Sequence, residues 1–191
     1  MTSSVNPFGA GPQPLLLVTV GTDHHPFARL LDWVGRWSAA HPSWQVEVQH
    51  GATPAPGYGH CFAYCGHDEL QRLFATADVV VTHGGPATIT QARAAGHVPV
   101  VVPRQPALGE HVDDHQVLFA RRLGAAGVVH LAETEAALAA AVDAARAGAH
   151  GGRPAAAGGL DVPPGVLKVG LVVEQLVAGR RRGARRPLGP A

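Results

Sequence analysis

Apolar runs alternate with helical stripes along most of the chain. Runs of Leu and Val that suit a strand covered on both faces, together with weaker runs, predict strands at residues 15–20, 46–48, 61–64, 79–81, 98–102 and 127–131. Apolar residues at helical spacing between these runs predict helices at residues 27–41, 70–74, 86–95, 114–123 and 133–147. This alternation predicts an α/β fold with a doubly wound, parallel, Rossmann-like sheet, whose ligands lie outside the carboxyl ends of its strands.

A glycine turn follows the most apolar run, at residues 79–81. His83 ends the strand, and Gly84 and Gly85 leave no Cβ atom where the chain must turn sharply. Pro86 fits the opening of a helix, whose unpaired backbone N–H groups and positive dipole end favour a phosphate. The sequence therefore predicts an anion-binding turn, with the His83 side chain beside the anion.

Three short motifs occur in order, each at the carboxyl end of a predicted strand: Thr19-Val-Gly-Thr22, His83-Gly-Gly-Pro-Ala-Thr-Ile-Thr-Gln91 and Asp113-Asp-His-Gln116. Through these motifs, residues 15–145 resemble the C-terminal, donor-binding domain of the family 28 glycosyltransferases, the MurG-like group. The likeness is strongest to the small catalytic subunits of split N-acetylglucosaminyl and exopolysaccharide transferases. It implies the C-terminal half of a GT-B glycosyltransferase.

The resemblance also implies a function. It implies a catalytic subunit that binds a UDP-sugar, such as UDP-N-acetylglucosamine, and transfers the sugar with inversion to a lipid-linked or polysaccharide acceptor held by a partner. The implied donor-binding residues are Gly21, Thr22, His83, Gly84, Gly85, Ala87, Thr88, Gln91, His115 and Gln116. The catalytic base stays unknown, because in such families it normally comes from the acceptor-side domain. Apart from the UDP-sugar substrate, no cofactor is expected.

Gln91 departs from the family pattern, which usually has Glu at this position. A carboxylate accepts hydrogen bonds from both ribose hydroxyls, whereas Gln accepts through one oxygen only. A non-catalytic nucleotide-sugar-binding or regulatory subunit therefore stays an alternative, as do a structural scaffold and a hydrolase that uses the histidines. Retention of the phosphate turn together with His115 and Gln116 favours a donor-binding subunit over a scaffold.

Length and charge narrow the choice of partners. The 191 residues suit one domain, whereas a two-domain nucleotide-sugar transferase needs about twice that length. We therefore expect a membrane-associated protein to supply the acceptor domain. The formal net charge of +1 gives no reason to expect a nucleic-acid partner. The pairs His24-His25 and His111/His115 fit a metal site, but no His-Glu-x-x-His motif accompanies them and twelve histidines make chance pairs common, so we expect no metal.

Composition divides the chain into five segments. These are a flexible N-terminal tail (1–14), a donor-binding domain (15–147), a linker (148–164), a C-terminal helix (165–180) and a basic tail (181–191). The helix either docks on the domain or a partner, or lies with its Arg-rich tail on an anionic membrane surface. No signal peptide or apolar stretch of ~20 residues is seen. We expect the two cysteines, Cys61 and Cys65, to be reduced thiols. We therefore expect a cytoplasmic protein, peripheral at the inner face of the membrane through its partner.

Overall fold

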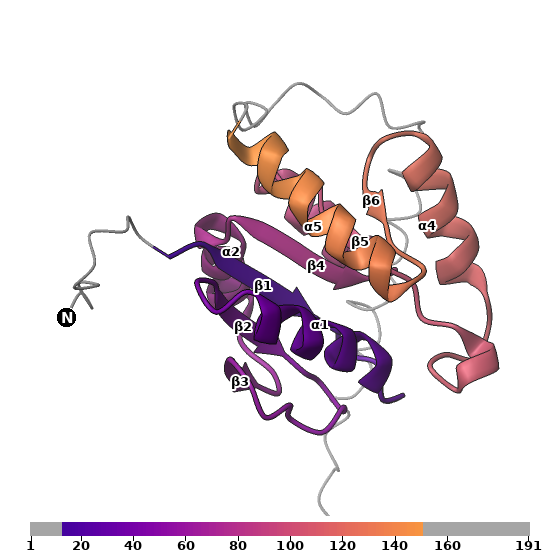
Figure 1. The fold of residues 1–191 in the computed structure, drawn as a ribbon. Coiled ribbons are helices and arrows are strands. Elements are labelled where there is room, and N and C mark those ends of the chain that lie inside the picture. The colour runs from indigo at the N-terminus through magenta and orange to yellow at the C-terminus, as the bar shows by residue number, and fades with distance from the viewer. Residues whose placement is uncertain (1–12, 151–191) are drawn as a thin grey trace, which may run out of the picture.

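The sheet of the protein has the strand order expected of a Rossmann-like fold. The computed structural model describes residues 13–150 and shows a six-stranded parallel sheet in the order β3-β2-β1-β4-β5-β6 (Figure 1). Its strands are β1 (Leu15–Thr19), β2 (Gln45–Gln49), β3 (His60–Phe62), β4 (Val79–His83), β5 (Val100–Val102) and β6 (His130–Leu131). The predicted fold class is confirmed.

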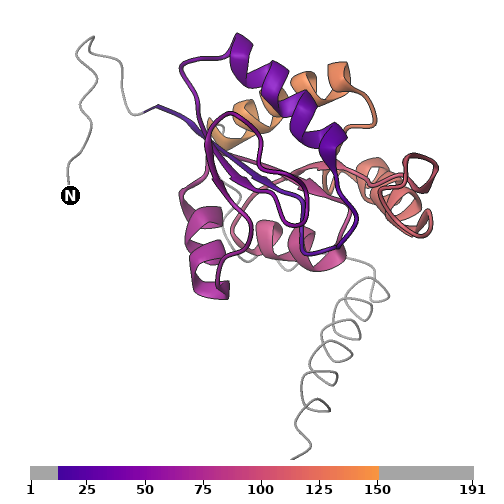
Figure 2. The same cartoon turned by 90° about the horizontal axis from the view of Figure 1, so that it is seen from below.

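Helices cover both faces of the sheet. The helices are α1 (Ala28–Ala40), α2 (His67–Thr76), α3 (Pro86–Ala94), α4 (His115–Ala125) and α5 (Glu135–His150), with a 3₁₀ turn, η1 (Pro106–Leu108), before α4. Helices α1 and α5 lie on one face, and α2 and α3 lie on the other (Figure 2). Alternation along β1 explains this, because Leu16 and Val18 pack beneath α1 and α5 whereas Leu17 packs with Phe74 of α2.

The sheet reverses direction between β1 and β4. From β1 the chain moves outward through β2 to β3, and it then returns to β4 on the other side of β1. The pairs Val18↔Val81 and Thr19↔Thr82 align the carboxyl ends of the two strands. The turns that follow β1 and β4 therefore lie side by side, at the place where open α/β sheets bind ligands.

Several predicted boundaries differ from the structure. The predicted strand 127–131 contains only the two residues of β6, because β6 is an edge strand paired with β5 alone. The segment between the predicted strand 98–102 and the predicted helix 114–123 contains η1. Helix α5 begins at Glu135 rather than 133 and continues to His150, because its Ala-rich sequence is strongly helix-forming. The first residues of the predicted linker 148–164 therefore belong to α5.

Some predictions lie outside the described residues. These are most of the N-terminal tail 1–14, the linker beyond residue 150, the helix 165–180 and the basic tail 181–191. Between residues 13 and 150, no helix is long and apolar enough to cross a membrane. Cys61 and Cys65 are free thiols, and both side chains are partly buried rather than in the core.

Candidate functional site

The imidazole of His83 lies between the glycine turns that follow β1 and β4. A Cβ atom at Gly21 would lie 2.4 Å from His83 Cε1, and one at Gly85 would lie 2.2 Å from His83 Nε2. Both distances are well below van der Waals contact. Gly21 also has a φ of +77°, which favours glycine on backbone grounds. Glycine at these two positions is therefore what allows the ring to fit at the switch point of the sheet.

His83 is uncharged at neutral pH. Its residue is only 8% exposed, and burial together with the nearby positive charge of Arg104 lowers the pKa of His83 to about 4. Thr82 Oγ1 lies 3.4 Å from Nδ1. A neutral imidazole carries one N–H donor. Toward an anion, a neutral His83 would therefore offer at most one N–H donor and no positive charge.

Gln116 packs against a third glycine of the site, Gly84. A Cβ atom at Gly84 would lie 2.9 Å from Gln116 Cβ and 3.2 Å from its Oε1. The Gln116 residue is only 4% exposed, and its Oε1 has no hydrogen-bond partner among the described residues. Such an unpaired buried acceptor is unfavourable by about 1–3 kcal/mol. The site thus contains a buried oxygen that a hydroxyl donor would satisfy.

A buried side-chain network fixes the turn at Gly21. Gln49 Oε1 accepts hydrogen bonds from Thr19 Oγ1 at 2.6 Å and from the Gly21 N–H at 3.1 Å. Gln49 Nε2 donates to the carbonyl of Gly21 at 3.0 Å and to that of Ala63 at 2.7 Å. Gln49 thereby holds both backbone polar groups of Gly21, and the turn after β1 keeps a single geometry.

The structure brings five of the ten predicted donor residues into contact: Gly21, His83, Gly84, Gly85 and Gln116. Of the other five, Thr22 lies in the loop after β1, whereas Ala87, Thr88, Gln91 and His115 lie on α3 and α4. Thr22 and Ala87 are exposed, and Thr88 and Gln91 are partly buried on α3. His115 is exposed and its Nδ1 contacts the Asp113 carboxylate, whereas the next residue, Gln116, is buried. Neighbouring residues on a helix point about 100° apart, so His115 and Gln116 do not share one orientation.

Sequence reasoning missed Arg104, which is fully buried just after β5. Its Nη1 donates to the carbonyls of His25 at 2.7 Å and Glu110 at 3.0 Å, and its Nη2 donates to the carbonyl of Val20 at 2.8 Å. The guanidinium also lies 4.7 Å from the centre of the Phe27 ring. Arg104 therefore joins the loop after β1 to the loop after β5. A charge directly following the buried run 100–103 is the sequence signal that marks it.

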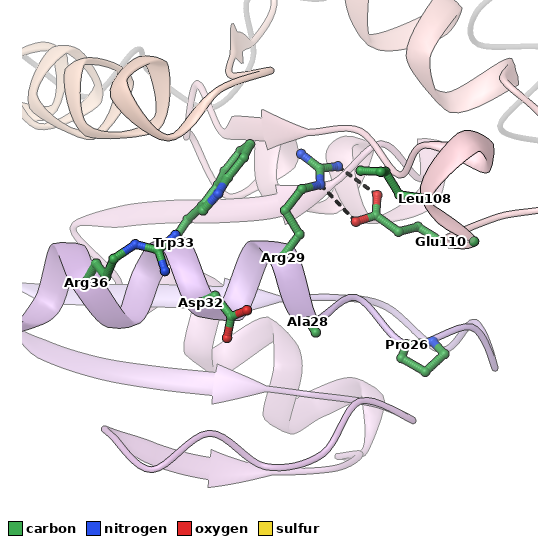
Figure 3. A pocket seen from close by; sticks show the side chains of 9 residues that line it. Pro26, Ala28, Arg29, Asp32, Trp33, Arg36, Leu108 and Glu110 are labelled. Carbon is green, nitrogen blue, oxygen red and sulfur yellow. Dashed lines mark hydrogen bonds and ion pairs between the residues drawn. The ribbon is translucent and has the colours of Figure 1, made fainter.

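A pocket of about 520 Å³ opens between α1 and the loop before α4 (Figure 3). In this pocket, Arg29 Nε donates to Glu110 Oε1 at 2.8 Å and Arg29 Nη2 donates to Glu110 Oε2 at 2.7 Å. The lining residues are Pro26, Ala28, Arg29, Asp32, Trp33, Arg36, Leu108, Gly109 and Glu110. None of the ten predicted donor residues lines it, so the pocket and the predicted site are separate features.

Comparison with known families identifies the domain. The model of the glycosyltransferase family 28 C-terminal domain matches residues 15–156, which is most of the chain and includes every predicted donor residue. The chain belongs to this family. A comparison with curated proteins gave no match.

Solved structures show the same fold in larger glycosyltransferases. The glycotransferase of kitacinnamycin is 22% identical with a TM-score of 0.58, and the match covers 87% of this chain and 43% of that chain. CalG4, the calicheamicin glycosyltransferase, is 18% identical with a TM-score of 0.56, and the match covers 93% of this chain and 47% of that one. The family 28 domain thus has the fold of the C-terminal half of a GT-B glycosyltransferase, and the chain spans less than half the length of these proteins.

Gly85→Ala is expected to destabilise the family 28 domain far more than Gly66→Ala. Each glycine precedes a helix with backbone angles that alanine accepts, φ −74° at Gly85 and −69° at Gly66. Only at Gly85 does the new Cβ meet a side chain, the His83 ring, which Gly21 confines on its other side. We expect an additional loss of about 1–3 kcal/mol in the free energy of unfolding, measured by urea denaturation. Equal losses in the two variants would show that the ring moves aside freely.

His83 is expected to make the protein less stable in mild acid. Its pKa is about 4 when folded and about 6.5 when unfolded, so the unfolded state takes up the proton first. Stability from this residue is present above pH ~6.5 and is lost as the pH falls through ~4, on the order of 3 kcal/mol. His83→Gln should therefore lose less stability between pH 7 and 4.5 than the wild type, by chemical denaturation at each pH.

His60→Gln provides a control of opposite sign. A hydrogen bond to Glu47 raises the pKa of His60, so protonation of His60 favours the folded state and its removal should steepen the acid loss. The same pH dependence in the wild type and in His83→Gln would contradict a neutral, buried His83.

Proposed function

We propose that this chain is the donor-binding catalytic subunit of a glycosyltransferase that uses a UDP-sugar, with UDP-N-acetylglucosamine as the first candidate. The observation that carries the proposal is the gathering of His83, Gln116 and three glycines where β1 and β4 meet, within a family 28 domain. In sheets of this order a ligand binds at that point, outside the carboxyl ends of the strands.

The start of α3 supports binding of the donor diphosphate. Between residues 13 and 150 no side chain caps this helix at Gly85, and the Ile89 N–H donates to the Gly85 carbonyl at 3.1 Å. The N–H groups of Ala87 and Thr88 precede Ile89 and have no helical acceptor, so they remain for an anion. The leaving diphosphate gains negative charge as the anomeric bond breaks. These N–H groups, the helix dipole and the His83 ring would stabilise that charge.

Two amide side chains support recognition of the rest of the donor. Gln116 offers a buried acceptor, Oε1, and its amide group carries donors as well, so it suits a sugar hydroxyl. Gln91 lies on α3, about one helical turn after Ala87 and Thr88. We propose that its side chain binds the ribose of the donor. With one acceptor oxygen, Gln91 would hold one ribose hydroxyl where a carboxylate would hold two.

The proposal includes a second protein. The predicted donor ligands lie along one edge of one sheet, which forms a single wall of a cleft. Transfer requires an acceptor and a general base within hydrogen-bond reach, across from the donor. We place the acceptor site and the base on a membrane-associated partner that presents a lipid-linked or polysaccharide acceptor. The acceptor attacks the anomeric carbon from the face opposite the diphosphate, which inverts the configuration.

The full-length chain is expected to bind UDP at least tenfold more tightly than uridine, a difference of ~1.4 kcal/mol. Contacts with the diphosphate at the start of α3 are the physical reason, and isothermal titration calorimetry measures both affinities. Gly85→Ala should weaken UDP binding at least tenfold because it displaces the His83 ring, whereas Gly66→Ala should leave it unchanged. Equal affinities for uridine and UDP in the folded wild type would remove the diphosphate from the proposal.

Sugar transfer is expected to need the partner. The purified full-length chain, without membranes, should bind UDP and yet show no transfer of a labelled sugar from UDP-N-acetylglucosamine to lipid or glycan acceptors. Addition of the partner should restore transfer. Turnover by the chain alone at an ordinary enzymatic rate, about 1 s⁻¹ or faster, would show that the base and the acceptor site lie on this chain.

A further inference from the structure

Four polar residues from two loops that are far apart in the sequence lie close together beside the predicted donor site. Asp23, His24 and His25 lie in the loop after β1, and His111 lies in the loop before α4. Asp23 Oδ1 is 2.7 Å from His25 Nδ1 and 3.6 Å from His24 Nδ1, and Asp23 Oδ2 is 3.4 Å from His111 Nε2. One carboxylate thus contacts three imidazoles.

The two loops are held together rigidly. Arg104 Nη1 donates both to the carbonyl of His25 and to that of Glu110, the residue before His111. The Glu110 side chain is fixed in turn by Arg29. The side chains of Asp23, His25 and His111 are 22%, 24% and 11% exposed, so three members of the cluster are partly buried. The three partly buried members are therefore held in a preformed arrangement, whereas the His24 side chain is 85% exposed.

We propose that Asp23, His24, His25 and His111 bind one Zn²⁺ ion. In a tetrahedral site with zinc–ligand bonds of ~2.0–2.1 Å, neighbouring ligand atoms lie about 3.3 Å apart. The three distances from the Asp23 carboxylate lie between 2.7 and 3.6 Å, so a shift of the exposed His24 and of His111 toward Asp23 would complete the site. Ligand atoms of Asp23, His24 and His25 also lie within 4.8 Å of one another. Imidazole nitrogen and carboxylate oxygen are ordinary zinc ligands.

The Asp113 carboxylate lies near the outer nitrogen of His111. The Nε2 of His111 faces Asp23, whereas its Nδ1 accepts a hydrogen bond from the Asp113 N–H at 3.3 Å and lies 3.6 Å from Asp113 Oδ1. Zinc-bound histidines usually donate their second ring N–H to a carboxylate, which fixes the tautomer and the ring orientation. Zinc binding at Nε2 would place the ring proton on Nδ1, next to the Asp113 carboxylate, which also contacts His115. From the separate histidine pairs in the sequence we expect no metal, and it is the contact between His111 and Asp23 in the fold that favours one.

Calorimetry with Zn²⁺ tests the site without any nucleotide, so its outcome is independent of donor binding. The full-length chain, free of metal and of any histidine tag, should bind one equivalent of Zn²⁺. His111→Ala and Asp23→Asn should each weaken the affinity at least tenfold. His60→Ala should leave it unchanged, because His60 also pairs with a carboxylate, Glu47 at 2.7 Å, but belongs to no group of three potential ligands among the described residues.

Co²⁺ gives a second measurement on the same variants. The wild type and His60→Ala should show the intense visible absorption of tetrahedral Co²⁺, and His111→Ala should lose it. Circular dichroism tests whether each variant is folded. If Asp23→Asn is unfolded, the zinc affinity of His111→Ala alone tests the site. Absence of Zn²⁺ binding by the folded wild type, or wild-type affinity in His111→Ala, would overturn the site.

Discussion

The buried guanidinium of Arg104 is the interaction on which the functional edge of this domain depends. It is fully excluded from solvent, and three backbone carbonyls, those of Val20, His25 and Glu110, accept its hydrogen bonds. Burying a charge is unfavourable unless it is well hydrogen-bonded. Loop conformations that turn these carbonyls away from Arg104 are therefore strongly disfavoured. One side chain thus sets the relative positions of the loops after β1 and β5.

A second constraint is steric. The His83 ring fills the space between the β1 and β4 turns, and Gly21 and Gly85 are required because any Cβ atom would overlap it. Gln49 completes the arrangement by holding both polar backbone groups of Gly21. Close packing leaves the ring little room for water, and that exclusion of water is the main cause of its low pKa. The packing and the protonation state of His83 therefore have the same origin.

The sequence predicts the order and type of the elements because burial on both faces of a parallel sheet imposes continuous Val and Leu runs. It also predicts that the motifs at residues 19–22, 83–91 and 113–116 share one edge, since strand carboxyl ends gather there. It does not predict the partners of Arg104, which are carbonyls and carry no sequence signature. Nor does it predict that His111 contacts Asp23, because only the tertiary fold brings these two loops together. Strand lengths at the edges depend on pairing and are missed for the same reason.

The distribution of charge at this edge indicates how it would hold an anion. His83 is neutral, and both Nη atoms of Arg104 are engaged by carbonyls. The three N–H groups of Arg104 that donate to carbonyls cannot contact a phosphate without releasing a loop, and its buried Nε has no partner among the described residues. Its positive charge also acts through space, because it adds to the effect of burial in lowering the pKa of His83. In the proposed complex, direct contacts to a diphosphate would come from N–H groups at the start of α3 and from the His83 ring. Such donors are fixed by the fold, so they would need no rearrangement as charge develops on a leaving group.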